Sequence, residues 1–294
     1  MNDSRTLHPD QIATFDRDGF LVVEDFFSES ELADFGAAVD IGVAGRASGD
    51  SRPLEEKSLY EQSFIQCINL WEDDLAIRKF TFNADMGRMA ADLLHSDAVR
   101  IWHDQALYKE AGGRETDAHQ DRPFWPIDPP DQVTAWIPFD GSSRGHGAMA
   151  YLPGSHRLGL ERFVDISHVF QEPYDIVNDE AVAAIDPVWV EAKPGSIVFH
   201  HSLAVHLADA NAGDETRRVY CVIYFADGCV RRSPLPHLVP DRQGIEVNDP
   251  IRGDVSPIAW PRPEGDLPPT PTSRPPRLGF ASEDIDAEAD TPAK

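Results

Sequence analysis

The sequence predicts a mainly β protein, an antiparallel sandwich or barrel that carries helices at its flank. Two observations support this prediction. Helix-type segments are confined to about the first hundred residues, and from residue 99 onward short runs of strand-type composition alternate with turn residues. Hydrophobic residues make up 41% of the chain and charged residues 26%, as in ordinary globular proteins, so the chain can bury a sizeable core.

The N-terminal segment predicts helices and one short strand. A helix should begin at Pro9-Asp10 and break at Asp18-Gly19, and the apolar run Phe20–Val23 should form a buried strand. Ser28 and Glu31 have the spacing of a capping box at the start of a second helix. A mobile loop is expected at residues 44–53, and further helices near residues 74–82 and 85–95.

The predicted strands after residue 98 are separated by Gly, Pro, Asn and Asp turns. They are Val99–Tyr108, Gln132–Phe139, Ala148–Leu152, Val188–Glu191, Ser196–His201 and Arg217–Phe225. Residues 160–186 form an insertion with no assigned structure. Thirteen of the 24 prolines follow residue 230, and the end of the chain is acidic. We therefore expect one domain over residues 1–230, with a helical part at 1–98 and a strand-rich core at 99–230, and a disordered or surface-wrapping tail at 231–294.

Charge and cysteine content exclude several functions. The formal net charge is -25, which disfavours binding to nucleic acid or to an anionic membrane surface. The chain contains no apolar run long enough for a membrane span. Its cysteines, Cys67, Cys221 and Cys229, form no C-x-x-C pair, which argues against a disulfide framework or a thiolate zinc site. We expect a cytoplasmic protein.

Histidine and carboxylate residues are the remaining candidates for chemistry. A non-haem Fe(II) site of the facial-triad type needs two imidazoles and one carboxylate on one side of the ion. His-x-Asp on a strand supplies two of these ligands, because side chains two residues apart point to the same face. The chain has three such pairs, about one of which is expected by chance, and only His119-Gln120-Asp121 lies among the predicted strands.

A second histidine cluster lies further along the chain. His200, His201 and His206 follow one another within a predicted strand and its continuation. Each could be a buried, hydrogen-bonded core residue, but three together make that interpretation less attractive. Arg217, shortly after them, could hold a dicarboxylate through its planar fork, or could pair with a nearby Asp or Glu.

An ordered set of motifs spans most of the chain, from about Leu7 to Phe225. In chain order they are Asp16–Val23, Tyr108-Lys109 before a glycine loop, His119-Gln120-Asp121 followed by Phe124 and Trp125, Thr134–Asp140, Gly147–His156, and Gly195–His206 with Asn211 and Arg217. The set resembles the phytanoyl-CoA dioxygenase family of Fe(II)/2-oxoglutarate-dependent oxygenases. The resemblance implies a double-stranded β-helix, which is a cupin-like jelly roll whose mouth holds the metal.

The resemblance also implies roles for particular residues. His119, Asp121 and His206 would be the iron ligands, and Arg217 would bind the distal carboxylate of 2-oxoglutarate. The other matched positions are Gln105 and Trp136, which help to seat the co-substrate; Lys109 and Gln120, which are further candidates there; His201, which lies behind the ligands; and His200, at a position that is often aromatic. One departure is Ala208, where the family commonly has a serine.

The implied reaction couples oxidation of a substrate C–H bond by O2 to conversion of 2-oxoglutarate into succinate and CO2. Related halogenases replace the carboxylate ligand with a small residue, so Asp121 favours hydroxylation or another oxidation over halogenation. The acidic composition favours a small-molecule substrate, and the sequence carries no signal for an oligomeric state. Two alternatives remain: a metal-binding jelly roll that isomerises or only binds a ligand, and a structural sandwich whose histidines are core residues.

Overall fold

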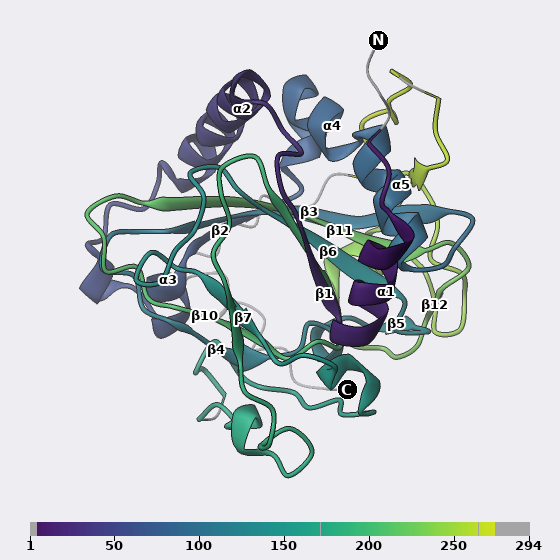
Figure 1. Ribbon diagram of the computed structural model, residues 1–294. Helices are drawn as coiled ribbons and strands as arrows, with labels where there is room; N and C mark the ends of the chain where they lie inside the picture. The colour runs from purple at the N-terminus through teal and green to yellow at the C-terminus, as the bar shows by residue number, and fades with distance from the viewer. Residues whose placement is uncertain (1–4, 171, 264, 274–294) are drawn as a thin grey trace, which may run out of the picture.

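Two antiparallel sheets face each other in the computed structural model, which describes residues 5–273 apart from 171 and 264 (Figure 1). The larger sheet has the strand order β1-β9-β6-β11-β3-β13, with β2 also paired to β3. Its strands are β1 (Phe20–Val23), β2 (Ile65–Ile68), β3 (Val99–Lys109), β6 (Gln132–Pro138), β9 (Ile197–His201), β11 (Arg217–Ala226) and β13 (Ile258–Trp260).

The smaller sheet has four strands in the order β4-β10-β7-β8. They are β4 (Thr116–His119), β7 (Met149–Tyr151), β8 (Val188–Val190) and β10 (His206–Ala208). A separate two-stranded pair is formed by β5 (Ile127–Asp128) and β12 (Val230–Arg231). This architecture confirms the predicted jelly roll with flanking helices.

The helices lie mostly in the N-terminal part and cover the larger sheet. They are α1 (Pro9–Asp18), α2 (Glu29–Ala47), α3 (Leu59–Ser63), α4 (Leu75–Thr81), α5 (Ala84–Leu93) and α6 (Leu238–Arg242). Ser28 and Glu31 do form a capping box at the start of α2. That helix runs to Ala47, into the segment expected to be a loop. In Figure 1, α2, α4 and α5 lie on the side of the larger sheet away from β4, β7 and β10. Over the described ranges, none of these helices has the length and apolar character that a membrane crossing requires.

Alternating side chains divide the larger sheet into two faces. Residues such as Ala135, Phe199 and Tyr220 pack outward against the helices, in one apolar core. Their neighbours Trp136, Val198 and Cys221 point inward, toward the smaller sheet, and form a second core. The inner face therefore supplies the walls of the space between the sheets, where the histidine cluster lies.

Two parts of the chain differ from the expected domain division. The predicted strand Phe20–Val23 is confirmed as β1, but together with β2, which was not predicted, it completes the larger sheet, so the segment before residue 99 is not a separate helical part. The segment after residue 230 is packed rather than peripheral: β13 pairs with β3, and Val239, Ile251 and Val255 are buried in the inner core. Prolines did not prevent this packing, because the segment uses short elements separated by turns. The part of the expected tail after residue 273 lies outside the described residues.

The insertion at residues 160–186 covers the outer side of the smaller sheet. Leu160, Val164, Ile176 and Val182 form a small core there with Leu152 and Val205, which flank β7 and β10. Among its described residues, which exclude 171, the one regular element is a short 3-10 turn at residues 176–178. Its apolar residues are too widely spaced for a helical or strand period, which is why no element could be predicted for it.

Candidate metal centre

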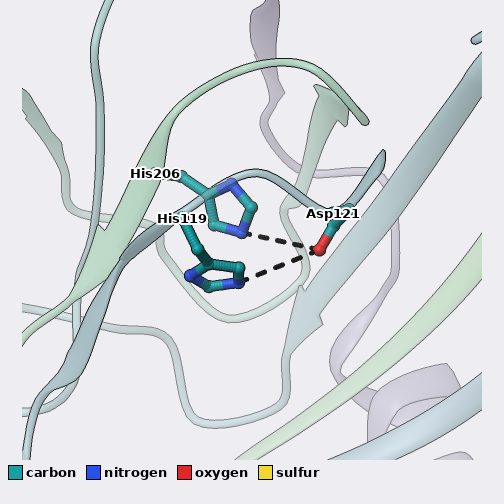
Figure 2. A group of neighbouring side chains, drawn as sticks. All are labelled: His119, Asp121 and His206. Atoms are coloured by element: carbon teal, nitrogen blue, oxygen red, sulfur yellow. Dashed lines mark ion pairs between the residues drawn. The ribbon is translucent and has the colours of Figure 1, made fainter. Parts of the chain in front are cut away.

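Three predicted ligand residues meet inside the jelly roll. His119 is the last residue of β4 and His206 the first of β10, and the two residues are paired across these strands. Nε2 of each imidazole lies 3.9 Å from Oδ1 of Asp121 (Figure 2). The ligand atoms of all three residues lie within 4.8 Å of one another. Two imidazoles and a carboxylate at this separation are the donor set of a 2-His-1-carboxylate site.

The backbone conformation at Asp121 differs from the predicted strand. The His-x-Asp spacing predicts that His119 and Asp121 lie on one strand, but β4 ends at His119. Asp121 has helical backbone angles (φ -70°, ψ -37°) and precedes a 3-10 turn at residues 122–124. Gln120, between them, is fully buried and donates hydrogen bonds from its side chain to the carbonyls of Leu160 and Leu203. Gln120 thus anchors the insertion and is not directed at the metal centre, contrary to expectation.

Backbone carbonyls fix the orientation of both imidazoles. Nδ1 of His119 donates to the carbonyl of Asp117 (2.7 Å), and Nδ1 of His206 donates to the carbonyl of Ala204 (3.0 Å). In each case the acceptor lies two residues earlier in the chain. With the proton held on Nδ1, the Nε2 lone pair faces Asp121, which is the tautomer that a metal ligand needs.

Burial changes the pKa values of the three ligand residues. It lowers the pKa of His206 to about 3 and also lowers the pKa of His119, so both rings are neutral at pH 7. Burial would raise the pKa of Asp121, but the imidazoles of His206, His200 and His119 outweigh it and hold that pKa below its usual range. A neutral pair of imidazoles beside a carboxylate anion is ready for a divalent cation without loss of protons.

His200 and Thr134 hold the carboxylate in place. Both donate to Oδ2 of Asp121 at 3.3 Å, and Nδ1 of His200 accepts a hydrogen bond from the Tyr151 hydroxyl (3.2 Å). This leaves Oδ1 as the oxygen that faces the ligand imidazoles. The expected residue behind the ligands, His201, lies on the other face of β9 beside Phe15. Side chains alternate between the two faces of β9. Once the inner face was known, this alternation would have identified His200, rather than His201, as the residue behind the ligands.

Arg217 is a buried cation without an anion. Its side chain is on the inner face of β11, the residue is 2% exposed, and its one hydrogen bond is from Nη1 to the carbonyl of Gly147 (3.3 Å). Its Nε has no partner, and no carboxylate within the described chain pairs with it. Burial lowers the pKa of Arg217 to about 10, so it remains charged at pH 7. The next residue, Arg218, makes the salt bridges to Asp40 and Asp140 instead.

The other co-substrate candidates surround Arg217. Trp136 is buried, and its ring centroid lies 5.5 Å from the guanidinium carbon of Arg217. Gln105 lies on the inner face of β3, across β11 from Trp136, and its Oε1 accepts a hydrogen bond from Gln66 (2.7 Å). Lys109 pairs with Arg217 in the sheet and is completely buried. Nζ of Lys109 donates to the carbonyl of Arg114 and to the Thr116 hydroxyl. Nε of Arg217 is therefore the buried donor of this group that lacks an acceptor within the described residues.

Lys109 should make stability depend on pH. Burial, together with the charge of Arg217, lowers the pKa of Lys109 from 10.5 to about 7. The unfolded chain keeps this proton up to its ordinary pKa, so between pH 7 and 10 folding releases a proton and stability rises with pH. We expect the wild-type protein to gain about 2 kcal/mol more than Lys109→Met between pH 7 and 9.5, measured by urea unfolding. Parallel stability profiles for the two proteins would contradict this assignment.

Aromatic residues flank the metal centre on the side of the insertion. Phe124 lies edge-on to His119, with ring centroids 6.2 Å apart, and Phe163 of the insertion lies 5.1 Å from Phe124. Phe163 is 49% exposed. Trp125 is buried and contacts the ring of His103. Phe124 and Phe163 thus form a row of ring contacts from the surface to His119.

Comparison with known proteins identifies the family. The sequence model of the phytanoyl-CoA dioxygenase (PhyH) family matches residues 15–219. A phytanoyl-CoA dioxygenase of Arabidopsis thaliana is 26% identical over 268 residues, covering 78% of this chain and 93% of its own. A probable alpha-ketoglutarate-dependent hypophosphite dioxygenase of Stutzerimonas stutzeri is 25% identical over 222 residues, covering 71% and 75%.

Solved structures confirm the fold. The non-heme alpha ketoglutarate dependent carbocyclase SnoK from nogalamycin biosynthesis superposes with a TM-score of 0.69 at 22% identity, covering 86% of this chain and 96% of its own. EctD from S. alaskensis, solved with 2-oxoglutarate and 5-hydroxyectoine, gives a TM-score of 0.64 at 21% identity and covers 81% and 82%. With the family match over most of the chain, these findings show that the protein belongs to the phytanoyl-CoA dioxygenase family of Fe(II)- and 2-oxoglutarate-dependent oxygenases.

Proposed function

We propose that this protein is a dioxygenase that uses Fe(II), 2-oxoglutarate and O2 to hydroxylate, or otherwise oxidise, an unactivated C–H bond of a small organic molecule. One observation carries the proposal: a charged, buried arginine, Arg217, stands without an anion on the inner face that also faces the His119, Asp121 and His206 centre. A buried cation is costly unless an anion compensates it. A dicarboxylate that reaches the metal with its other end would provide that anion.

His119, Asp121 and His206 would hold the Fe(II), since their Nε2, Oδ1 and Nε2 atoms, respectively, converge. Bound iron with 2-oxoglutarate and O2 supplies an oxidant strong enough for a C–H bond, with succinate and CO2 as co-products. The chain's own contribution is geometric. The carbonyls of Asp117 and Ala204 keep the Nε2 lone pairs of the two imidazoles available, and His200 restrains the other carboxylate oxygen.

Arg217 would bind the distal carboxylate of 2-oxoglutarate through its guanidinium fork. Trp136 would form a wall of the same site, and Gln105 and Lys109 would supply further donors. A fixed charge at one end of the co-substrate decides which end meets the metal. Gly147 supports this arrangement, because a Cβ at that position would lie 3.1 Å from Nε of Arg217. A side chain there would displace the guanidinium.

The net charge of the chain and the aromatic residues beside His119 indicate the substrate class. The net charge of -25 disfavours polyanions, and the Phe124 and Phe163 rings present an apolar surface beside His119. Retention of the carboxylate ligand Asp121 favours hydroxylation over halogenation. These features support a small organic substrate that is largely apolar.

The proposal is tested by incubating purified protein with Fe(II), 2-oxoglutarate and O2 and measuring succinate. We expect slow, uncoupled succinate formation without added substrate, in an amount that depends on both iron and oxygen. A protein that binds iron but converts no 2-oxoglutarate under these conditions would instead be the non-oxidative metal-binding jelly roll, an isomerase or ligand-binding protein. A protein that binds no metal would support the structural sandwich.

A further inference from the structure

A β-bulge in β3 turns two consecutive side chains toward the interior. The register between β3 and β11 shifts between Ile223 and Tyr224, which pair with His103 and Ile101. Trp102 is therefore the extra residue, and it packs in the inner core beside Phe225, while Ile101 packs in the outer core. His103 opposes the inward-facing Ile223. Bulges commonly re-aim side chains next to active sites.

His103 lies in line with the carboxylate of the metal centre. His103 pairs with Ile223, Ile223 pairs with Thr134, and Thr134 pairs with His200, so these residues form one row across the larger sheet. Thr134 and His200 are the residues that hold Asp121. With neighbouring strands about 4.8 Å apart, His103 stands roughly 10 Å from Thr134 at the same level of the jelly roll. Arg217 lies six residues before Ile223 on β11, so it stands at a different level of the jelly roll from His103.

The ring of His237, from the C-terminal segment, lies beside Trp102 and His103. Its ring stacks on Trp102 with centroids 4.4 Å apart and lies 5.8 Å from the ring of His103, at an interplanar angle of 22°. Trp125 closes the group, edge-on to His103 at 6.2 Å. Two imidazoles thus lie against two indoles in the row of residues that leads to the metal centre, and neither imidazole has a role in holding the metal or the co-substrate.

The hydrogen bonds of the two rings fix opposite tautomers. Nδ1 of His103 donates to the backbone carbonyl of Asp104 (3.2 Å), which leaves its Nε2 as an acceptor. Nδ1 of His237 accepts from the backbone N–H of Val239 (3.2 Å), which leaves its Nε2 as a donor. Neither Nε2 has a hydrogen-bond partner within the described residues. Burial lowers the pKa of His103 to about 4 and that of His237 well below its ordinary value, so both rings are neutral.

Ring nitrogens without a partner, next to a buried indole N–H that also lacks one, can bind the polar group of a ligand. His103 is only 4% exposed and His237 is half-buried, and the neighbouring indole N–H of Trp102 is buried without a hydrogen bond. One acceptor and one donor beside aromatic rings, with the nearby Arg231 paired to Asp241, match a group that donates and accepts at the same atom. A hydroxyl group does this, whereas a carboxylate or an ammonium group matches only one of the two.

We propose that His103 and His237 bind a hydroxyl group of an uncharged, largely apolar substrate and thereby position its C–H bond at the metal centre. The hydroxyl would donate to Nε2 of His103 and accept from Nε2 of His237, while the Trp102 and Trp125 rings contact the adjoining carbon skeleton. This inference rests on the proposed dioxygenase function and specifies its substrate class. The two histidines are positioning residues.

The test uses the full-length protein loaded with Zn2+ and 2-oxoglutarate, so that no turnover occurs. The probes are matched pairs of an alcohol and its deoxy counterpart: cyclohexanol and cyclohexane, benzyl alcohol and toluene, and 2-decalol and decalin. Long-range 1H–15N spectra of the imidazoles report the tautomers and the binding. We expect His103 protonated on Nδ1 and His237 on Nε2, shifts of both Nε2 resonances with alcohols, and about tenfold tighter binding of at least one alcohol than of its counterpart.

Variants separate hydrogen bonding from packing. His103→Leu and His237→Leu should each reduce the preference for the alcohol to about twofold or less, whereas His103→Gln, which keeps an acceptor near the Nε2 position, should retain part of it. Equal binding of alcohols and counterparts, no binding of any alcohol, or a preference that survives His103→Leu would overturn the inference. Binding of Zn2+ and 2-oxoglutarate is recorded in the same samples, so failure of the proposed function would be seen separately.

Discussion

Replacing Asp121 with alanine should lower the affinity for Fe(II) by about 100-fold or more and abolish succinate formation. The variant removes the one anionic ligand and leaves His119 and His206 as a neutral pair. It also leaves the His200 imidazole without its carboxylate acceptor. Metal affinity is measured by anaerobic titration and succinate by chromatography after incubation with O2.

Asp97→Ala is the matched control for this prediction. Asp97 belongs to another His-x-Asp sequence, with His95, but lies on the surface after α5. We expect its iron affinity and succinate formation to equal those of the wild type. Iron binding by Asp121→Ala at wild-type affinity would remove Asp121 from the ligand set and show that the metal is held elsewhere.

Replacing Arg217 with methionine should have opposite effects on two measurements. The apparent 2-oxoglutarate requirement should rise about 30-fold or more, because a buried charge-assisted pair is lost. The free energy of unfolding without co-substrate should rise by about 1–3 kcal/mol, because the variant removes a buried charge that has no carboxylate partner. A purely structural role for Arg217 predicts destabilisation instead.

Arg218→Met provides the comparison on the same strand. Arg218 pairs with Asp40 and Asp140 near the surface, and such pairs contribute about 1 kcal/mol or less. Its 2-oxoglutarate requirement should stay at the wild-type value. Addition of 2-oxoglutarate with iron should raise the melting temperature of the wild type and of Arg218→Met, but not that of Arg217→Met. Equal ligand stabilisation of all three proteins would contradict co-substrate binding by Arg217.

Long elements with clear local signals were predictable from the sequence. Ser28 and Glu31 marked the start of α2, and the apolar composition of residues 99–108 and 217–225 marked the two longest strands. The short strands β4 and β10, which carry His119 and His206, were not separated from their surroundings. Three or four residues give no measurable period, and their pairing depends on contacts between distant segments. The same reason explains why β13 was missed within a proline-rich segment.

The site was predictable in residue type but not in its supporting contacts. The triad residues were identified from motifs, yet the predicted shared strand for His119 and Asp121 was wrong, because the chain turns after His119. His200 and His201 could not be distinguished until the inner face of β9 was known. Whether Arg217 or Arg218 pairs with a surface carboxylate likewise depended on strand direction, since the two residues point to opposite faces of β11.

We propose that His119, Asp121 and His206 hold one Fe(II) and that Arg217 binds the far carboxylate of a 2-oxoglutarate that chelates this iron. Anaerobic titration of the protein with Fe(II) and 2-oxoglutarate, followed by visible absorption, tests both parts of this proposal together. We expect one iron per chain and a charge-transfer band that needs both additions, does not form with succinate, and in Arg217→Met requires a much higher 2-oxoglutarate concentration. Iron that binds without any such band would show that 2-oxoglutarate does not chelate the metal at this centre.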